Sequence, residues 1–401
     1  MPEFRTWTEA LNAPWTSEHL SIFHVCHAGR EQPCGFLMPP LQTEAGASLA
    51  ATNITRRAAA LRKPFAFETG VNYFAPRPCE MPDGEFFRAV AEAADCGILL
   101  DLTNLWANHK NGRADLDDVL ARLPFERVWE VHLAGLEFAH GHWLDAHSNG
   151  IDDELVDIAS EVVADLPNLG TIIFEIAPDR IDRFGERNLL LEMEKLHLLW
   201  GRVRHAARST PDAKVMARRT LAEPTTPSPE DWERLLANRM LSSGDLLPAG
   251  TLEMRRLDEQ AFSLYRRLAA SFRRGAIAEL MENTTRLLLL ALGEAELRQF
   301  MDRYVAATLP VAFPTDEALC FSRYLEENPR TIPGLDDLSK FESTLIAAAA
   351  DGGTKRVELS RDVEAMLDEV AMGRLPGPAT ERPGTVLEIV VDPVPAVRMI
   401  S

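Results

Sequence analysis

The chain has 401 residues, of which 46% are hydrophobic, and a formal net charge of −19. This length predicts two domains, and the lack of an apolar run near twenty residues argues against a membrane-spanning helix. The acidic balance argues against nucleic acid as a partner, because phosphate binding needs local positive charge. Five widely spread cysteines and an N-terminus unlike a signal peptide predict a reduced, cytoplasmic protein.

Short apolar runs alternate with helical stretches from Trp15 to about Ile181. The runs are almost continuously apolar, as in parallel strands that are covered on both faces. Repeated strands and helices predict an α/β layer fold, and a barrel is favoured over an open sheet. Strands are expected at 62–68, 98–101, 127–132 and 171–175, and helices at 86–95, 116–123 and 155–166.

The composition becomes polar and proline-rich between residues 206 and 229, which predicts a linker. We therefore predict a first domain over 1–205, the linker over 206–229 and a mostly α-helical domain over 230–401. In this second domain, helices are expected at 231–241, 252–279, 284–292, 295–309 and 338–350, and a small strand pair that includes 385–391 is expected at the end.

All ten histidines lie within the first 205 residues. Each of the four expected strands also ends in a side chain that can bind a metal: Glu68, Asp101, His132 and Glu175. In a barrel these strand ends meet at the mouth where active sites form. A single strand-end carboxylate is commonly a helix cap or an ion-pair partner. Three that converge repel one another unless a cation lies between them, so the pattern favours a metal site.

Further candidate ligands flank these strands. His19 precedes the first expected strand, and Asn104 follows Asp101 by three positions. Asp145 and His147 are two residues apart, which places both side chains on one side of an extended segment. His24, Cys26 and His27 superficially suggest zinc, but no second cysteine pair accompanies them. The other histidines are expected in solvated loops or on helix surfaces: His109, His140, His142, His197 and His205.

Five segments resemble, in order and spacing, the multinuclear non-haem iron-dependent oxidative enzymes related to the methanobactin-maturation oxidase. They are Ser17-Glu18-His19-Leu20, Asp101-Leu102-Thr103-Asn104, His132-Leu133-Ala134-Gly135, Asp145-Ala146-His147 and Ile173-Phe174-Glu175. The resemblance implies a xylose-isomerase-like TIM barrel with two or three iron ions, as Fe(II)/Fe(III). It also implies dioxygen-dependent modification of residues, often cysteine, in ribosomally synthesised precursor peptides. The metal ligands that it implies are His19, Glu68 as a bridge, Asp101, Asn104, His132, Asp145, His147 and Glu175.

The chain departs from this family in three places. Only eighteen residues precede His19, so we expect the upstream strand that ends in His-Gly-Val to be absent, and up to two strands of the barrel to be missing. Leu136 stands where members often have another histidine, and Glu175-Ile176-Ala177 replaces Glu-Trp-Asp. These departures predict an altered or lost iron site. An incomplete barrel would also need a second copy or a companion subunit to cover its open edge.

The second half resembles, less specifically, the helical partner proteins encoded beside these oxidases, in 309–314, 321–325 and 332–342. The resemblance implies an oxidase fused to the partner that brings the precursor peptide to the iron. A generic helical packing domain is the alternative. Three functions stay open: a peptide-modifying oxidase, which we favour, a metal-dependent isomerase or hydrolase on the same fold, and a degenerate barrel that serves as a peptide-binding scaffold.

Overall fold

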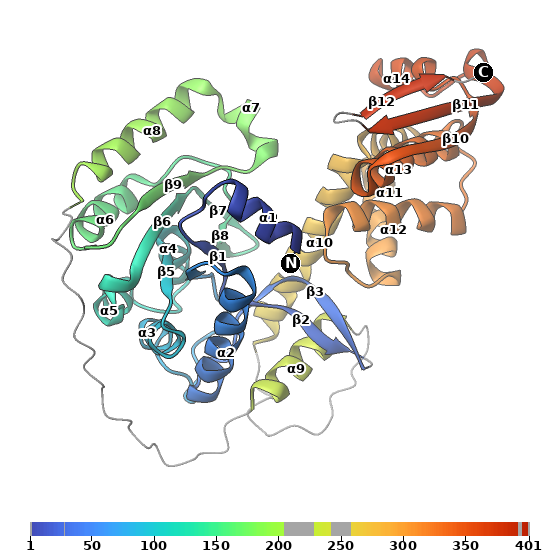
Figure 1. The fold of residues 1–401 in the computed structure, drawn as a ribbon. Coiled ribbons are helices and arrows are strands. Elements are labelled where there is room, and N and C mark those ends of the chain that lie inside the picture. Colours follow the sequence, from blue (N-terminus) through green and yellow to red (C-terminus); the bar gives the residue numbers. More distant parts are fainter. Residues whose placement is uncertain (1, 28, 204–227, 242–257, 392–394, 400–401) are drawn as a thin grey trace. The chain divides into compact units, whose positions relative to one another are not determined.

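The computed structural model describes residues 2–27, 29–203, 228–241, 258–391 and 395–399 (Figure 1). The chain forms two compact units. One comprises Met1–Ile22, Leu37–Leu235 and Pro248–Ala261, and the other comprises Phe23–Phe36, Leu236–Leu247 and Phe262–Ser401. His205, residues 206–227 of the expected linker and residues 252–257 of an expected helix lie outside the described residues.

A five-stranded parallel sheet with the order β1-β4-β5-β6-β9 forms the centre of the first unit. It curls into half of a barrel with helices around it (Figure 1), so the expected TIM-barrel-like α/β fold is confirmed. All four expected strands are present. The additional strand β1 ends at His19 and escaped prediction because its four residues, Thr-Ser-Glu-His, contain no apolar run. The strands are β1 Thr16–His19, β4 Phe65–Glu68, β5 Gly97–Asp101, β6 Val128–Ala134 and β9 Thr171–Glu175.

The core of the first unit lies between the sheet and its helices. Strand residues such as Phe67 and Leu133 pack there with Phe86 of α3. Because successive side chains of a strand point to opposite faces, Glu68 and His132 lie on the inner face, away from this core. The helices are α1 Pro2–Ala10, α2 Glu44–Leu61, α3 Asp83–Ala94, α4 Leu102–Lys110, α5 Leu116–Arg122, α6 Asp153–Ala164, α7 Ile181–Phe184 and α8 Glu186–Trp200, with 3-10 turns at Phe125–Arg127 and Pro178–Arg180.

Two antiparallel hairpins interrupt the alternation of strands and helices: β2 Ile22–His27 with β3 Arg30–Met38, and β7 Leu136–Ala139 with β8 His142–Asp145.

The expectation of a solvated loop was wrong for two histidines. His142 begins β8, with its ring against Tyr73 at 6.0 Å between centroids. His109 lies in the last turn of α4 and stacks on Trp106 at 5.1 Å. His197 is exposed on α8, as expected for a helix surface.

The second unit is mostly helical, as expected, and ends in an antiparallel sheet with the order β10-β11-β12. The kink in α11 at Gly293, where φ is 73°, separates the two helices expected at 284–292 and 295–309. The small strand pair that was expected is a sheet of three strands. Strand β10 was not predicted because its many charged residues obscure the alternation that is typical of a strand. The elements are α9 Pro229–Leu241, which both units share, α10 Glu259–Leu280, α11 Glu282–Ala307, α12 Pro314–Glu327, α13 Leu335–Asp351, β10 Gly353–Arg361, α14 Val363–Ala371, a 3-10 turn Pro378–Thr380, β11 Glu381–Val391 and β12 Pro395–Met399.

Within the described ranges, no helix combines the length and the apolar character that crossing a membrane requires.

Candidate metal centre

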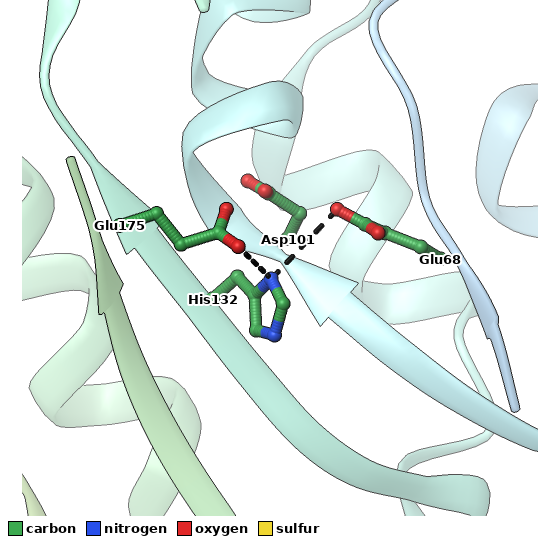
Figure 2. Close-up of side chains that lie close together, drawn as sticks. All are labelled: Glu68, Asp101, His132 and Glu175. Carbon is green, nitrogen blue, oxygen red and sulfur yellow. Dashed lines mark ion pairs between the residues drawn. The ribbon is translucent and has the colours of Figure 1, made fainter. Parts of the chain in front are cut away.

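The C-terminal ends of the parallel strands bring carboxylates and imidazoles into one cluster. One oxygen or nitrogen atom each from Glu68, Asp101, His132 and Glu175 lies within 4.8 Å of the others. Figure 2 shows these four side chains around a common point, with the His132 ring between the two glutamates. The strand register explains the arrangement, because it pairs His19 with Glu68 and Asp101 with His132.

Three more of the predicted ligands adjoin this cluster. His19 Nε2 lies 3.5 Å from Glu68 Oε2. His147 Nε2 lies 2.9 Å from Asp145 Oδ2 and 3.6 Å from Glu175 Oε2. His147 also has a left-handed backbone conformation, with φ of 50°, which is uncommon for a residue with a side chain and recurs at functional sites. Seven of the predicted ligands therefore form one connected group.

The eighth predicted ligand, Asn104, lies beside Asp101 at the start of α4. Asp101 caps this helix, since its Oδ1 accepts a hydrogen bond from Asn104 N at 2.7 Å. Asn104 Nδ2 donates to Thr69 O at 3.1 Å, and Asn108 Nδ2, one turn later, donates to Gly70 O at 3.3 Å. Helix α4 thus fixes the loop that follows β4, so Asn104 has a structural role in addition to any role as a ligand.

The β7–β8 hairpin leads the chain to Asp145. At Gly135, directly before this hairpin, the backbone passes close to Asn149. Glycine is needed there because a Cβ on residue 135 would lie 2.2 Å from Asn149 O. The Asn111 side chain accepts from Trp143 N and donates to Trp143 O, both at 2.8 Å. Leu136, where the family often has a histidine, packs against the apolar core and so offers no ligand there.

Burial and repulsion control the protonation of the carboxyl groups. Burial raises the pKa of Asp101 well above its ordinary value, and the neighbouring Asp145 and Glu68 raise it further. Burial also raises the pKa of Glu68, although His19 and His132 oppose the change. Buried carboxylates of like charge destabilise one another, and a bound cation would remove that cost.

The imidazoles partly compensate the carboxylates. Burial alone would lower the pKa of His132, but its contacts with Glu130 and Glu175 outweigh burial and raise it to about 10. The pKa values of His19 and His147 are raised in the same way, against the effect of burial. Since an imidazole must be neutral to bind a metal, an incoming ion would displace these protons.

Unpartnered buried atoms test whether these residues fit a metal ion. Buried polar atoms nearly always have hydrogen-bond partners. Within the described structure, four atoms here make no hydrogen bond: Asp101 Oδ2, Asn104 Oδ1, His132 Nδ1 and Asp145 Oδ1. Of these, His132 Nδ1 has an ion-pair contact of 3.2 Å with Glu175 Oε1. Carboxylate oxygens, an amide oxygen and an imidazole nitrogen suit a first-row transition metal, so the residues fit a metal ion.

Glu130 was not among the predicted site residues, but it lies on the inner face of β6 two residues before His132. Its Oε1 is 3.1 Å from His132 Nε2, and its Oε2 accepts from Trp15 Nε1 at 2.8 Å. The spacing of Glu130 and His132 contained the signal, because residues two apart on a strand share a face.

The curled parallel sheet, with carboxylates and imidazoles at its strand ends, places the first unit in the class of TIM-barrel-like α/β proteins whose mouth could bind a metal. Within that class, residues 1–184 match the model of a family of RiPP precursor modification enzymes, MbnB/TglH/ChrH, so this part of the chain is similar to that family.

Curated relatives share the same region. A UPF0276 protein of Chromobacterium violaceum is 33% identical over 157 residues, which cover 39% of this chain and 55% of the relative. A UPF0276 protein of Anaeromyxobacter sp. is 32% identical over 166 residues, or 41% of this chain and 57% of the relative. A third, from Streptomyces avermitilis, is 29% identical over 159 residues, which cover 39% of this chain and 33% of the relative. The chain thus spans about half the length of the first two relatives and a third of the last.

Proposed function

We propose that this chain is an iron- and dioxygen-dependent enzyme that oxidatively modifies a cysteine residue in a ribosomally synthesised precursor peptide. The observation that carries the proposal is the connected group of seven ligand side chains at the strand ends, within the region that matches a RiPP precursor modification family. The donor set is compatible with Fe(II) that activates dioxygen, because carboxylate and imidazole ligands suit it, and the choice of iron among the first-row metals comes from the family resemblance.

The eight predicted ligands would hold two or three ions. When bound, the iron would acidify a substrate thiol and supply electrons to dioxygen. Glu68 supports more than one ion, since its two oxygens face different imidazoles: Oε2 is 3.5 Å from His19 Nε2, and Oε1 is 3.8 Å from His132 Nδ1. A carboxylate in that position can bridge two ions.

Differences in exposure indicate the side from which a substrate would approach. The side chains of Glu68 and His132 are each 9% exposed, whereas those of His19 and His147 are 40% and 31% exposed. A peptide thiol would therefore reach the cluster past these two histidines, which are more exposed than Glu68 and His132. The buried residues behind them would exclude water from the inner part of the site.

The helical unit would help to bind the precursor peptide, as the resemblance to partner proteins implies. The segment 309–314 begins after α11, and Leu309 and Phe313 within it are 45% and 65% exposed. Exposed apolar side chains of this kind are suited to contact with a partner. In the described part of the sheet, β1 and β9 each have one neighbour only, so a second copy or a companion subunit would cover these edges.

The test uses the full chain, purified without oxygen and loaded with Fe(II) or Zn(II). The probe is the peptide from a short reading frame beside the gene that has cysteines in its C-terminal part. We expect dioxygen uptake and a mass change of the peptide with Fe(II) only, both lost in His132→Ala and retained in His197→Ala, the control on α8. Turnover with Zn(II) without dioxygen would instead indicate a hydrolase or isomerase. A functional His132→Ala variant would indicate a scaffold.

A further inference from the structure

His132 directs its two ring nitrogens to different partners. Nδ1 faces the cluster, 3.2 Å from Glu175 Oε1 and 3.8 Å from Glu68 Oε1 (Figure 2). Nε2 lies 3.1 Å from Glu130 Oε1, outside the ligand group. A neutral imidazole carries one N–H, and its other nitrogen has a free lone pair. Whichever nitrogen donates to a carboxylate therefore decides which nitrogen can bind an ion.

The Glu130 carboxylate is held from its other side by Trp15. Trp15 Nε1 donates to Glu130 Oε2 at 2.8 Å, and the side chain of Glu130 is only 10% exposed. The indole itself has little freedom. It packs at 6.1 Å between ring centroids against Trp129, and a Cβ on Gly170 would lie 2.6 Å from its Cη2. Trp15, Glu130 and His132 thus form a continuous chain of contacts that ends at the cluster.

We propose that Glu130 is a positioning residue that keeps the proton of His132 on Nε2, so that Nδ1 is the metal-binding nitrogen, while Trp15 occupies the second oxygen of the same carboxylate. The inference rests on the proposed metal site. Outer carboxylates of this kind orient a ligating histidine and increase its basicity, and their removal commonly lowers metal affinity by about 10- to 100-fold.

The two hydrogen bonds that Glu130 accepts make the proposal testable with an isosteric change. A carboxylate offers two acceptor oxygens, whereas the glutamine of Glu130→Gln offers one oxygen and one NH₂ group. In that variant the amide oxygen can accept a hydrogen bond from either His132 or Trp15. The NH₂ group then faces the N–H donor of the other residue, and these two donors cannot form a hydrogen bond. Trp15→Phe removes one donor, so the double variant can turn its amide oxygen to His132 again.

The experiment measures the affinity of the full chain for Zn(II) by competition with a chromophoric chelator. We expect Glu130→Gln to weaken binding about 10- to 100-fold and Trp15→Phe to change it less than about threefold. The double variant should recover most of the loss, since coupled neighbours are not additive. Glu161→Gln, on the exposed surface of α6, is the matched control and should bind as the wild type does. Additive losses in the double variant would overturn the proposal, because a merely structural role gives no recovery.

A second measurement does not depend on any variant folding. In the wild-type chain, loaded with Zn(II) and labelled with ¹⁵N-histidine, the proposal requires the metal-shifted resonance of His132 to be Nδ1 and the protonated nitrogen to be Nε2. Binding through Nε2, or wild-type affinity in Glu130→Gln, would overturn this inference and leave the proposed metal site intact. A wild-type chain that binds no Zn(II), Co(II) or Fe(II) would instead overturn the proposed function.

Discussion

Replacing Asp101 by asparagine should stabilise the metal-free protein. Asp101 is fully buried, and its ligand atom lies within 4.8 Å of those of Glu68 and Glu175. Two like charges at 4.8 Å repel by about 3.5 kcal/mol at an effective dielectric constant of 20 and by about 0.9 kcal/mol in water. Charged imidazoles offset part of this repulsion, so we expect a net gain of about 1–3 kcal/mol in unfolding free energy. Asparagine retains the helix cap to Asn104 N, since both residues are good N-caps.

The assay is thermal unfolding in a chelator and in excess Fe(II) without oxygen. Each kcal/mol raises the melting temperature by about 2–4 °C for a domain of 150–250 residues, so Asp101→Asn should melt above the wild type in the chelator. The order should reverse with metal, because the wild type gains about 2.7 kcal/mol at a hundred times the dissociation constant and the variant loses a ligand. Burial raises the pKa of Asp101 in the folded state. Protonation therefore favours folding, and the advantage of the variant in chelator should grow as the pH rises above about 4.

Asp115→Asn is the matched control, because Asp115 caps α5 through a hydrogen bond from Asp118 N at 3.2 Å and lies outside the cluster at the strand ends. Its melting temperature should stay close to that of the wild type in both conditions, as expected when asparagine replaces aspartate at an N-cap. If Asp101→Asn melts below the wild type in the chelator, repulsion at Asp101 does not destabilise the metal-free protein. Asp101 would then be a charge on which the metal-free fold depends.

Three further predictions concern individual contacts. Burial raises the pKa of Cys96 to about 12, so alkylation at pH 8.5 should be slow until the protein unfolds, and mass spectrometry after graded denaturation checks this. Gly135→Ala places a Cβ 2.2 Å from Asn149 O; it should lower metal affinity and stability together, as measured by chelator competition and melting. In the second unit, Arg273→Met leaves the buried carboxylate of Glu317, now 2.8 Å from Arg273 Nε, without its cation. The loss should be about 3–5 kcal/mol, and Arg273→Met combined with Glu317→Leu should recover much of it in denaturant unfolding.

The strand ends of the first unit could be predicted from sequence because apolar runs with a terminal charged residue identify both the strand and the site. Strand β1 could not, since it is short and polar, although its last residue, His19, belongs to the cluster. The β7–β8 hairpin was missed for the same reason, because His140 and His142 lie among polar residues that resemble a loop. Pairing with neighbouring strands, and not local preference, creates these elements.

The outer contacts of the site could not be predicted from the sequence. Trp15 and Glu130 are 115 positions apart in the chain, and only the curled sheet brings the indole to the carboxylate. Likewise, the sequence identified Gly135 as part of a motif, but the close approach to Asn149 explains why a glycine is needed there. The nitrogen and oxygen ligands are common to several first-row metals, so the choice of iron comes from the family resemblance.

Anaerobic calorimetric titration of Fe(II) into the metal-free chain tests whether the cluster at the strand ends binds iron. We predict saturable binding by the wild type, with protons released as the imidazoles lose theirs. We also predict binding at least about 100-fold weaker in Asp101→Asn and His132→Ala, as expected when a ligand itself is lost. A wild type that takes up no Fe(II), or variants that bind it as tightly as the wild type does, would contradict the proposed iron site.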